Sequence, residues 1–138
     1  MRLAWTQIAS LPRPEITLRA FTPTAFDDAQ IGACFGIDVE RLARFRSWPR
    51  RIFVALREGE RLAGDSAFDP VNGTAPSFRV SRSEFTPVLL DALRAHAPPD
   101  GPKTLQFGVE DDRALVDTLQ AAGAEIVHEI LRMTAELR

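Results

Sequence analysis

The chain has few of the residues that build disulfides and metal sites. Its 138 residues include one cysteine, two histidines and no tyrosine. Cys34 has no partner for an internal disulfide, and a cysteine-based metal cluster is excluded. His96 and His128 are too far apart in the sequence for zinc-ligand spacing. The sequence therefore predicts no metal site, and a reducing compartment is its natural setting.

Excess charge of one sign and long apolar runs are also lacking. The formal net charge is −2 and the pI is about 5.7, so no basic field attracts nucleic acid. No apolar run is long enough to cross a bilayer, and the first twelve residues are too polar for a secretion signal. We expect a cytoplasmic protein that binds neither nucleic acid nor membranes. Monomer and homodimer both stay open.

What is present is the composition of one globular domain. Hydrophobic residues make up 45% of the chain and charged residues 26%. A single domain over residues 1–138 is expected from this length. Pro12 and Pro14 close residues 1–14, which we interpret as a loosely held lead-in.

The first half alternates helix and strand patterns. A strand is expected over 16–22 and a helix from Thr24 to Phe35, ended by Gly36. Asp38 is placed to cap a second helix, which ends before Pro49. Residues 51–57 and 61–69 are then expected to form a hairpin.

The chain is organised around residues 75–97. Phe78 and Val80 alternate with polar residues as in a half-buried strand. Thr86 is placed to cap a helix that begins with Pro87 and runs to Ala97. A strand that enters a helix through a short loop directs free backbone N–H groups and the positive end of the helix dipole to one place. That place suits a phosphate.

The remaining chain predicts a strand over 103–109, a helix opened by residues 110–112 and ended by Gly123, and a last strand over 125–137. The order is β-α-α-β-β-β-α-β-α-β, an α+β fold with a mixed, mostly antiparallel sheet flanked by helices. We expect strands 76–80 and 103–109 to lie side by side, to be parallel, and to diverge at their carboxyl ends. The core should contain Leu89, Leu93, Leu105, Phe107, Leu115, Leu119 and Ile126.

This order resembles the GCN5-related N-acetyltransferase (GNAT) fold from Ile16 onward. I-T-L-R-A-F-T-P-T-A-F-D-D is similar to the family's first strand and helix, and V-E-D-D-R-A-L-V-D-T-L-Q-A-A-G is similar to its last helix. The resemblance implies acetyl-CoA as donor and a small-molecule or peptide amine as acceptor. It implies that pantetheine lies between 77–80 and 105–109 and pyrophosphate lies at 81–86. The implied cofactor-binding residues are Phe78, Arg79, Val80, Ser81, Arg82, Ser83, Phe85 and Thr86.

The sequence departs from the family pattern in two places. The loop S-R-S-E-F-T has no glycine, and Glu84 would repel a phosphate. Arg79 and Arg82 are placed to offset that charge. The family's tyrosine acid is absent too, since Thr118 or Leu119 stands at the corresponding turn. Where the family commonly has an aromatic residue after the helix-ending glycine, this chain has Ala124.

The catalytic candidates are carboxylates. Glu110 is the candidate general base, with Asp65 and Asp69 as alternatives, and backbone N–H groups near Phe78–Val80 would polarise the thioester carbonyl. The competing interpretation of residues 110–112 is an acidic helix start. Structural roles are favoured for His96, His128 and Cys34. We interpret the arginines near Trp48 as a solvated helix face. The alternative is that they bind the adenosine 3′-phosphate or an acidic substrate. These arginines are Arg41, Arg44, Arg46, Arg50 and Arg51.

The sequence leaves three functions open. The first is an acetyl-CoA-dependent N-acetyltransferase. The second is a catalytically silent GNAT-fold domain that binds a ligand or another protein, which the missing glycines and tyrosine favour. The third is a ferredoxin-like binding domain, which would show no divergence between strands 76–80 and 103–109.

Overall fold

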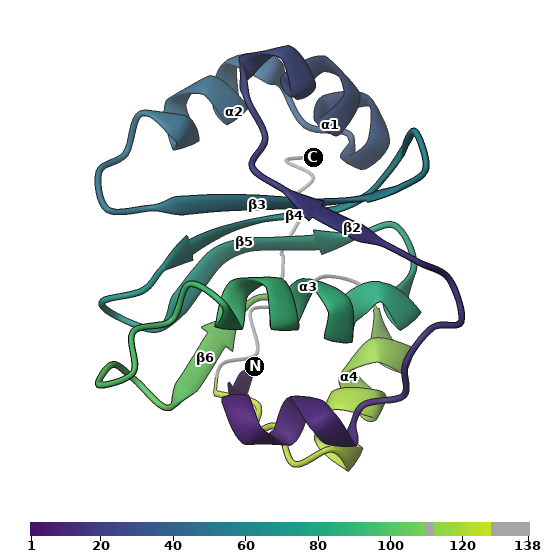
Figure 1. Ribbon diagram of the computed structural model, residues 1–138, viewed down its shortest axis with the longest axis vertical. Coiled ribbons are helices and arrows are strands. Elements are labelled where there is room, and N and C mark those ends of the chain that lie inside the picture. The colour runs from purple at the N-terminus through teal and green to yellow at the C-terminus, as the bar shows by residue number, and fades with distance from the viewer. Residues whose placement is uncertain (110–111, 128–138) are drawn as a thin grey trace, which may run out of the picture.

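The computed structural model describes residues 1–109 and 112–127. They form a mixed α+β structure around one six-stranded, mostly antiparallel sheet with the strand order β1-β6-β5-β4-β3-β2 (Figure 1). The strands are β1 (Arg2–Ala4), β2 (Arg19–Phe21), β3 (Ile52–Glu58), β4 (Arg61–Asp69), β5 (Thr74–Val80) and β6 (Thr104–Phe107). The α-helices are α1 (Asp28–Phe35), α2 (Val39–Arg46), α3 (Thr86–Arg94) and α4 (Arg113–Ala121), and the 3-10 helices are η1 (Trp5–Ser10), η2 (Ala25–Asp27) and η3 (Ser83–Phe85).

Most helix ends follow from local residues, as the sequence predicts. Gly36 ends α1 with a left-handed backbone at φ 67°, which glycine adopts without steric cost. The Asp38 carboxylate accepts a hydrogen bond from the Glu40 N–H at 3.0 Å and caps α2. Asp112 caps α4 in the same way, and Gly123 follows α4 with φ 104°.

The prediction that Thr86 is the N-cap of α3 is wrong. The 3-10 helix η3 runs directly into α3, so Thr86 is the first helical residue instead of the residue before it. Its hydroxyl is buried and has no hydrogen-bond partner among the described residues. Pro87 fits the first turn as expected, and α3 ends at Arg94, earlier than Ala97.

The expected loose lead-in is also wrong. Strand β1 pairs antiparallel with β6, and its Leu3 lies opposite Leu105. The apolar side chains of residues 1–11 are buried in the core, namely those of Leu3, Trp5, Ile8 and Leu11. Trp5 packs edge-on against Phe68, with ring centroids 5.9 Å apart. Burial of this apolar area outweighs the disorder expected at a chain end.

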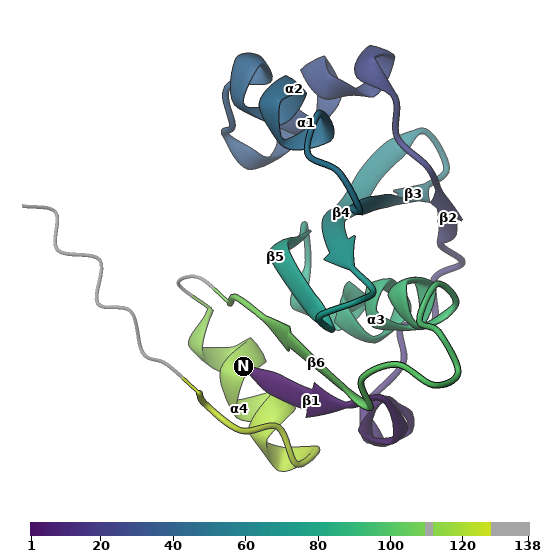
Figure 2. The same ribbon diagram turned by 90° about the vertical axis from the view of Figure 1, so that its left-hand side faces the viewer.

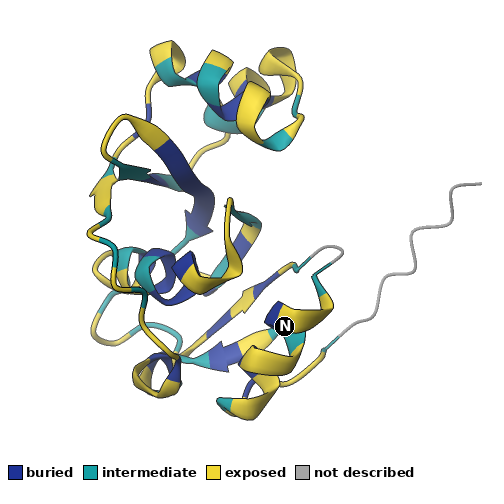
Figure 3. Cartoon of the chain, turned by 90° about the vertical axis from the view of Figure 1, so that its right-hand side faces the viewer, coloured by how far each residue is buried: buried dark blue, intermediate teal, exposed yellow. Residues whose placement is uncertain are grey.

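The two faces of the sheet carry separate cores. Val54 and Leu56 of β3 pack toward α3, whereas Ala55 between them packs with Leu42 of α2. Helices α1 and α2 therefore cover the face opposite to α3 (Figure 2). Figure 3 shows that burial follows the central strands and the inward sides of the helices.

The predicted core is confirmed in all members but one. Leu89, Leu93, Leu105, Phe107, Leu115 and Leu119 are buried, whereas Ile126 is exposed. Within residues 124–127, the described part of the chain after Gly123, a single bridge forms between Arg2 and Glu125, and the Ile126 side chain is exposed. From residue 128 onward, the expected last strand lies outside the described residues.

Candidate functional site

The central feature of the site is a bulge in β5. Thr74 pairs with Asp69 and Ser77 pairs with Ala67, so β5 advances three residues where β4 advances two. The extra residue falls at Ala75–Pro76. Proline has no N–H to donate to a ladder, and a bulge shifts the alternation of the strand. Both effects end the pairing between β5 and β6 at this point.

The parallel arrangement of β5 and β6 confirms the sequence prediction. Thr74 pairs with Gln106 and Ala75 with Phe107, and the pairing goes no further. Beyond the bulge, the Ser81 N–H donates to the Ala63 carbonyl of β4 at 2.8 Å. By the two-residue period, the backbone groups of Phe78 and Val80 then point away from β4, along an edge that β6 no longer covers.

A cleft opens where the two strands part. Its volume is about 310 Å³. The carboxyl half of β5 forms one side, Gly108, Val109, Asp112 and Leu115 line the second, and α1 and α2 form the third. The lining residues are Phe35, Arg41, Phe45, Pro76, Ser77, Phe78, Arg79, Val80, Gly108, Val109, Asp112 and Leu115. The divergence expected from the sequence is therefore present.

Arg79 is held on the sheet face of the cleft by Asp65. Its Nε and Nη2 donate to the two carboxylate oxygens at 2.8 and 2.9 Å, and Asp65 is buried. The pair is bidentate and directly cross-strand. Arg79 therefore stands in the cleft with its charge already compensated, and Asp65, the alternative base, is committed to it.

The loop from β5 to α3 differs from a phosphate cradle. Ser81, Arg82 and Ser83 are exposed, and Arg82 forms a 2.7 Å ion pair with Glu84. Phe85 and Thr86 are buried, and their side chains do not line the cleft. Of the eight predicted cofactor-binding residues, the structure thus brings three to the cleft: Phe78, Arg79 and Val80.

The other acidic candidates lie apart. Glu110 falls outside the described residues. Asp69 accepts hydrogen bonds from the Val71 N–H, the Asn72 N–H and the Asn72 side chain in the turn between β4 and β5. Burial alone would raise the pKa of Asp69, but these hydrogen bonds and the positive charge of Arg50 together outweigh burial and lower the pKa. Burial and the nearby Asp65 raise the pKa of the Cys34 thiol, which makes the thiolate scarcer.

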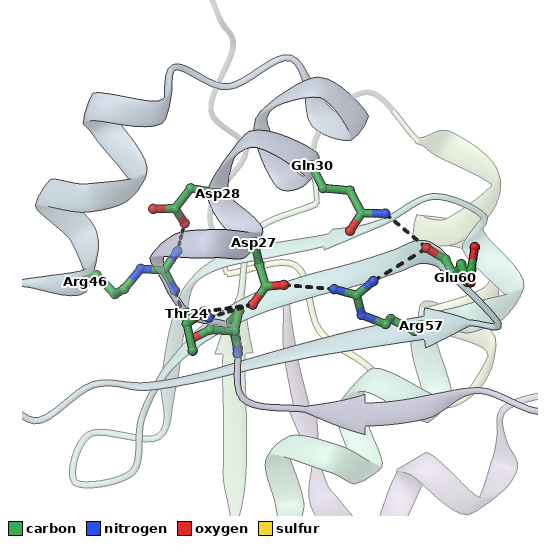
Figure 4. A network of polar contacts seen from close by, with 8 residues as sticks. Thr24, Asp27, Asp28, Gln30, Arg46, Arg57 and Glu60 are labelled. Carbon is green, nitrogen blue, oxygen red and sulfur yellow. Dashed lines mark hydrogen bonds and ion pairs between the residues drawn. The ribbon is translucent and has the colours of Figure 1, made fainter.

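A polar network fixes the helices that form the third side of the cleft (Figure 4). Asp27 accepts from the Thr24 N–H at 2.7 Å and from Arg57 of β3 at 2.8 Å. Asp28 at the start of α1 pairs with Arg46 at the end of α2. The network ties both helices to the sheet and so positions Arg41 and Phe45.

Three of the arginines near Trp48 make different contacts. Arg46 is committed to Asp28, and Arg51 stacks on the Trp48 ring at 4.3 Å. Arg41 points to the cleft instead, with its guanidinium 5.6 Å from the centre of the Phe45 ring. Sequence reasoning missed Phe35 and Phe45. The four-residue spacing of Arg41 and Phe45 places them on one helix face, and Pro76 inside a strand pattern indicates a bulge, so both signals were available.

No group of three or more potential metal ligands occurs among the described residues. Within the same residues, no helix has the length and apolarity needed to cross a bilayer. Comparison with family models, with curated proteins and with solved structures finds no match.

Proposed function

We propose that the cleft binds the pantetheine and thioester of an acyl coenzyme A, and that the chain is a GNAT-like N-acetyltransferase. The observation that carries this proposal is the bulge at Ala75–Pro76, after which β5 and β6 part and leave the backbone of Phe78 and Val80 facing an open cleft. Pantetheine contains two amide groups, and a free strand edge is suited to bind amides.

The order of elements supports the same family. From β2 to α4, the strands and α-helices read strand, two helices, three strands, helix, strand, helix, which agrees with the expected order up to its last strand; from residue 128 onward that strand lies outside the described residues. Strand β1 is an addition to it, since it occupies the outer edge beside β6.

The reaction is an acyl transfer. The neutral amine nitrogen of the acceptor forms a bond to the thioester carbonyl carbon, the carbon–sulfur bond breaks, and coenzyme A leaves as a thiolate that takes a proton. The amine gives up one proton in the same sequence. The N–H of Phe78 or Val80 is available to donate to the carbonyl oxygen as its negative charge develops.

A silent, ligand-binding GNAT-fold domain is the second candidate. The titratable side chains described on the cleft are Arg41, Arg79 and Asp112. Of these, Arg79 is paired with Asp65, and the Asp112 carboxylate caps α4. Neither side chain therefore has an obvious role in proton transfer. Coenzyme A binding without turnover of any amine would favour this candidate.

Calorimetric titration of the full chain with acetyl-CoA, CoA and pantetheine tests the binding site. Val80→Pro removes the cleft-facing N–H without removing a hydrogen bond to β4, and should weaken binding by about threefold to tenfold. Val80→Ala keeps the N–H and is the matched control. If the wild-type chain shows no affinity for acetyl-CoA at millimolar concentration, the proposal fails.

A further inference from the structure

The third side of the cleft carries Arg41, a cation that forms no ion pair with the part of the chain that the structure describes. Arg79 is paired with Asp65 and Arg82 with Glu84, whereas Arg41 makes no ion pair within residues 1–109 and 112–127. Arg41 lies above the Phe45 ring and lines the cleft together with Phe35. This side therefore combines one available guanidinium with two aromatic surfaces.

The second side of the cleft, lined by Gly108, Val109, Asp112 and Leu115, carries the opposite charge. Asp112 lines the cleft, and one of its carboxylate oxygens accepts the Leu115 N–H at 3.0 Å as the cap of α4. That hydrogen bond fixes the position of the carboxylate but does not neutralise it. A positive and a negative group thus line one cleft, whose lining also includes the aromatic residues Phe35 and Phe45.

The place of Arg41 separates it from the phosphates of the cofactor. Arg41 belongs to α2, which covers one face of the sheet, whereas the loop at Ser81–Arg82 leads to α3 on the opposite face (Figure 2). A pyrophosphate at that loop would lie on the far side of β5 from Arg41. An anion bound at Arg41 would then belong to the other reactant.

The geometry points to a free amino acid with an apolar side chain as the acceptor. Its carboxylate binds Arg41, its amino group lies on the side of Asp112, and its side chain packs against Phe35 and Phe45. That this amino acid is the acceptor rests on the proposed acyl transfer. The binding of the amino acid itself can be measured without coenzyme A.

The test is calorimetric titration of the full chain with phenylalanine, phenylalaninamide and phenethylamine. The amide and the amine keep the nitrogen and the ring but lose the carboxylate. We expect both to bind about tenfold more weakly than phenylalanine, the effect of one charge-assisted hydrogen bond. Arg41→Gln should abolish this difference, Arg41→Lys should restore part of it, and Arg44→Gln, an exposed arginine of α2 outside the cleft, should preserve it.

Equal affinity for the three compounds, no binding of any of them, or a preference that survives Arg41→Gln would overturn the inference. A parallel titration with acetyl-CoA distinguishes this failure from that of the proposed function. Acetyl-CoA binding with no preference for the carboxylate defeats the acceptor assignment alone. Phenylalanine binding through Arg41 without acetyl-CoA binding supports the amino-acid site and defeats the acyl transfer. Arg41 is exposed, so circular dichroism should show an intact fold for each variant.

Discussion

Arg79 and Asp65 face each other across the β4–β5 ladder and share two hydrogen bonds of 2.8 and 2.9 Å on the sheet face of the cleft. Removing one partner leaves the other largely buried and uncompensated. We expect Arg79→Leu to lower the free energy of unfolding by about 3 kcal/mol. The double variant Arg79→Leu/Asp65→Leu should recover much of this loss, as measured by urea denaturation. Additive losses in the double variant would show that the pair has no coupling.

Helix α3, on the sheet face opposite to α1 and α2, carries three fully buried leucines, Leu89, Leu90 and Leu93. Leu93 is fully buried in the larger core, so Leu93→Ala should cost about 2–5 kcal/mol through lost transfer energy and a residual cavity. Val88 on the same helix is only partly buried and provides the matched control, because Val88→Ala should cost clearly less. A loss below about half a kcal/mol for Leu93→Ala would contradict the described packing of α3.

Substitutions of the two partners in the Arg82–Glu84 ion pair should change the affinity for CoA in opposite directions. Glu84→Gln releases Arg82 and removes a like charge near a phosphate, so CoA should bind more tightly. Arg82→Ala should weaken CoA binding by about 1–3 kcal/mol. Calorimetry with CoA checks both, and Arg61→Ala, at the start of β4, is the control. If neither loop variant changes the affinity of a chain that binds CoA, the loop does not contact the phosphates.

The turn between β4 and β5 should make stability depend on acidity. The pKa of Asp69 is lowered in the folded state, so its hydrogen bonds stabilise the fold above the unfolded pKa and are lost as pH falls through the folded pKa. The loss should therefore occur below about pH 4. Asp69→Asn should flatten the stability curve below about pH 4, as measured by urea denaturation. Asp100→Asn, on an exposed loop, should leave this part of the curve unchanged.

Local signals predicted much of the fold. The two caps and the glycine stops lie within a few residues of the helices they define, and the hairpin at 51–69 follows from alternation and its turn. Sequence reasoning also predicted the parallel, diverging pair, because a helix between two strands restricts how they can connect. Pro76, at the place where this pair parts, is visible in the sequence as well.

The errors arise where distant segments compete. Residues 1–14 are interpreted as a loosely held lead-in because nothing local shows that Leu3 will lie opposite Leu105. Thr86 reads as a cap because η3, which extends the helix backward, depends on the burial of Phe85. For the site, Arg41 and Phe45 stand on a helix far from β5 in the sequence, so only the folded arrangement assigns them to the cleft.

The pairing of β1 with β6 also governs the order in which the chain can fold. The Met1 amino group donates to the Phe107 carbonyl, 106 positions away. During synthesis at about 5–20 residues per second, Leu3, Trp5 and Ile8 wait roughly 5–20 s for these partners to leave the ribosome. The helices and hairpins between them form within microseconds of emerging. Strand β1 therefore cannot pair with β6 until residues 104–107 have been made, and until then Leu3, Trp5 and Ile8 are open to chaperones and to aggregation.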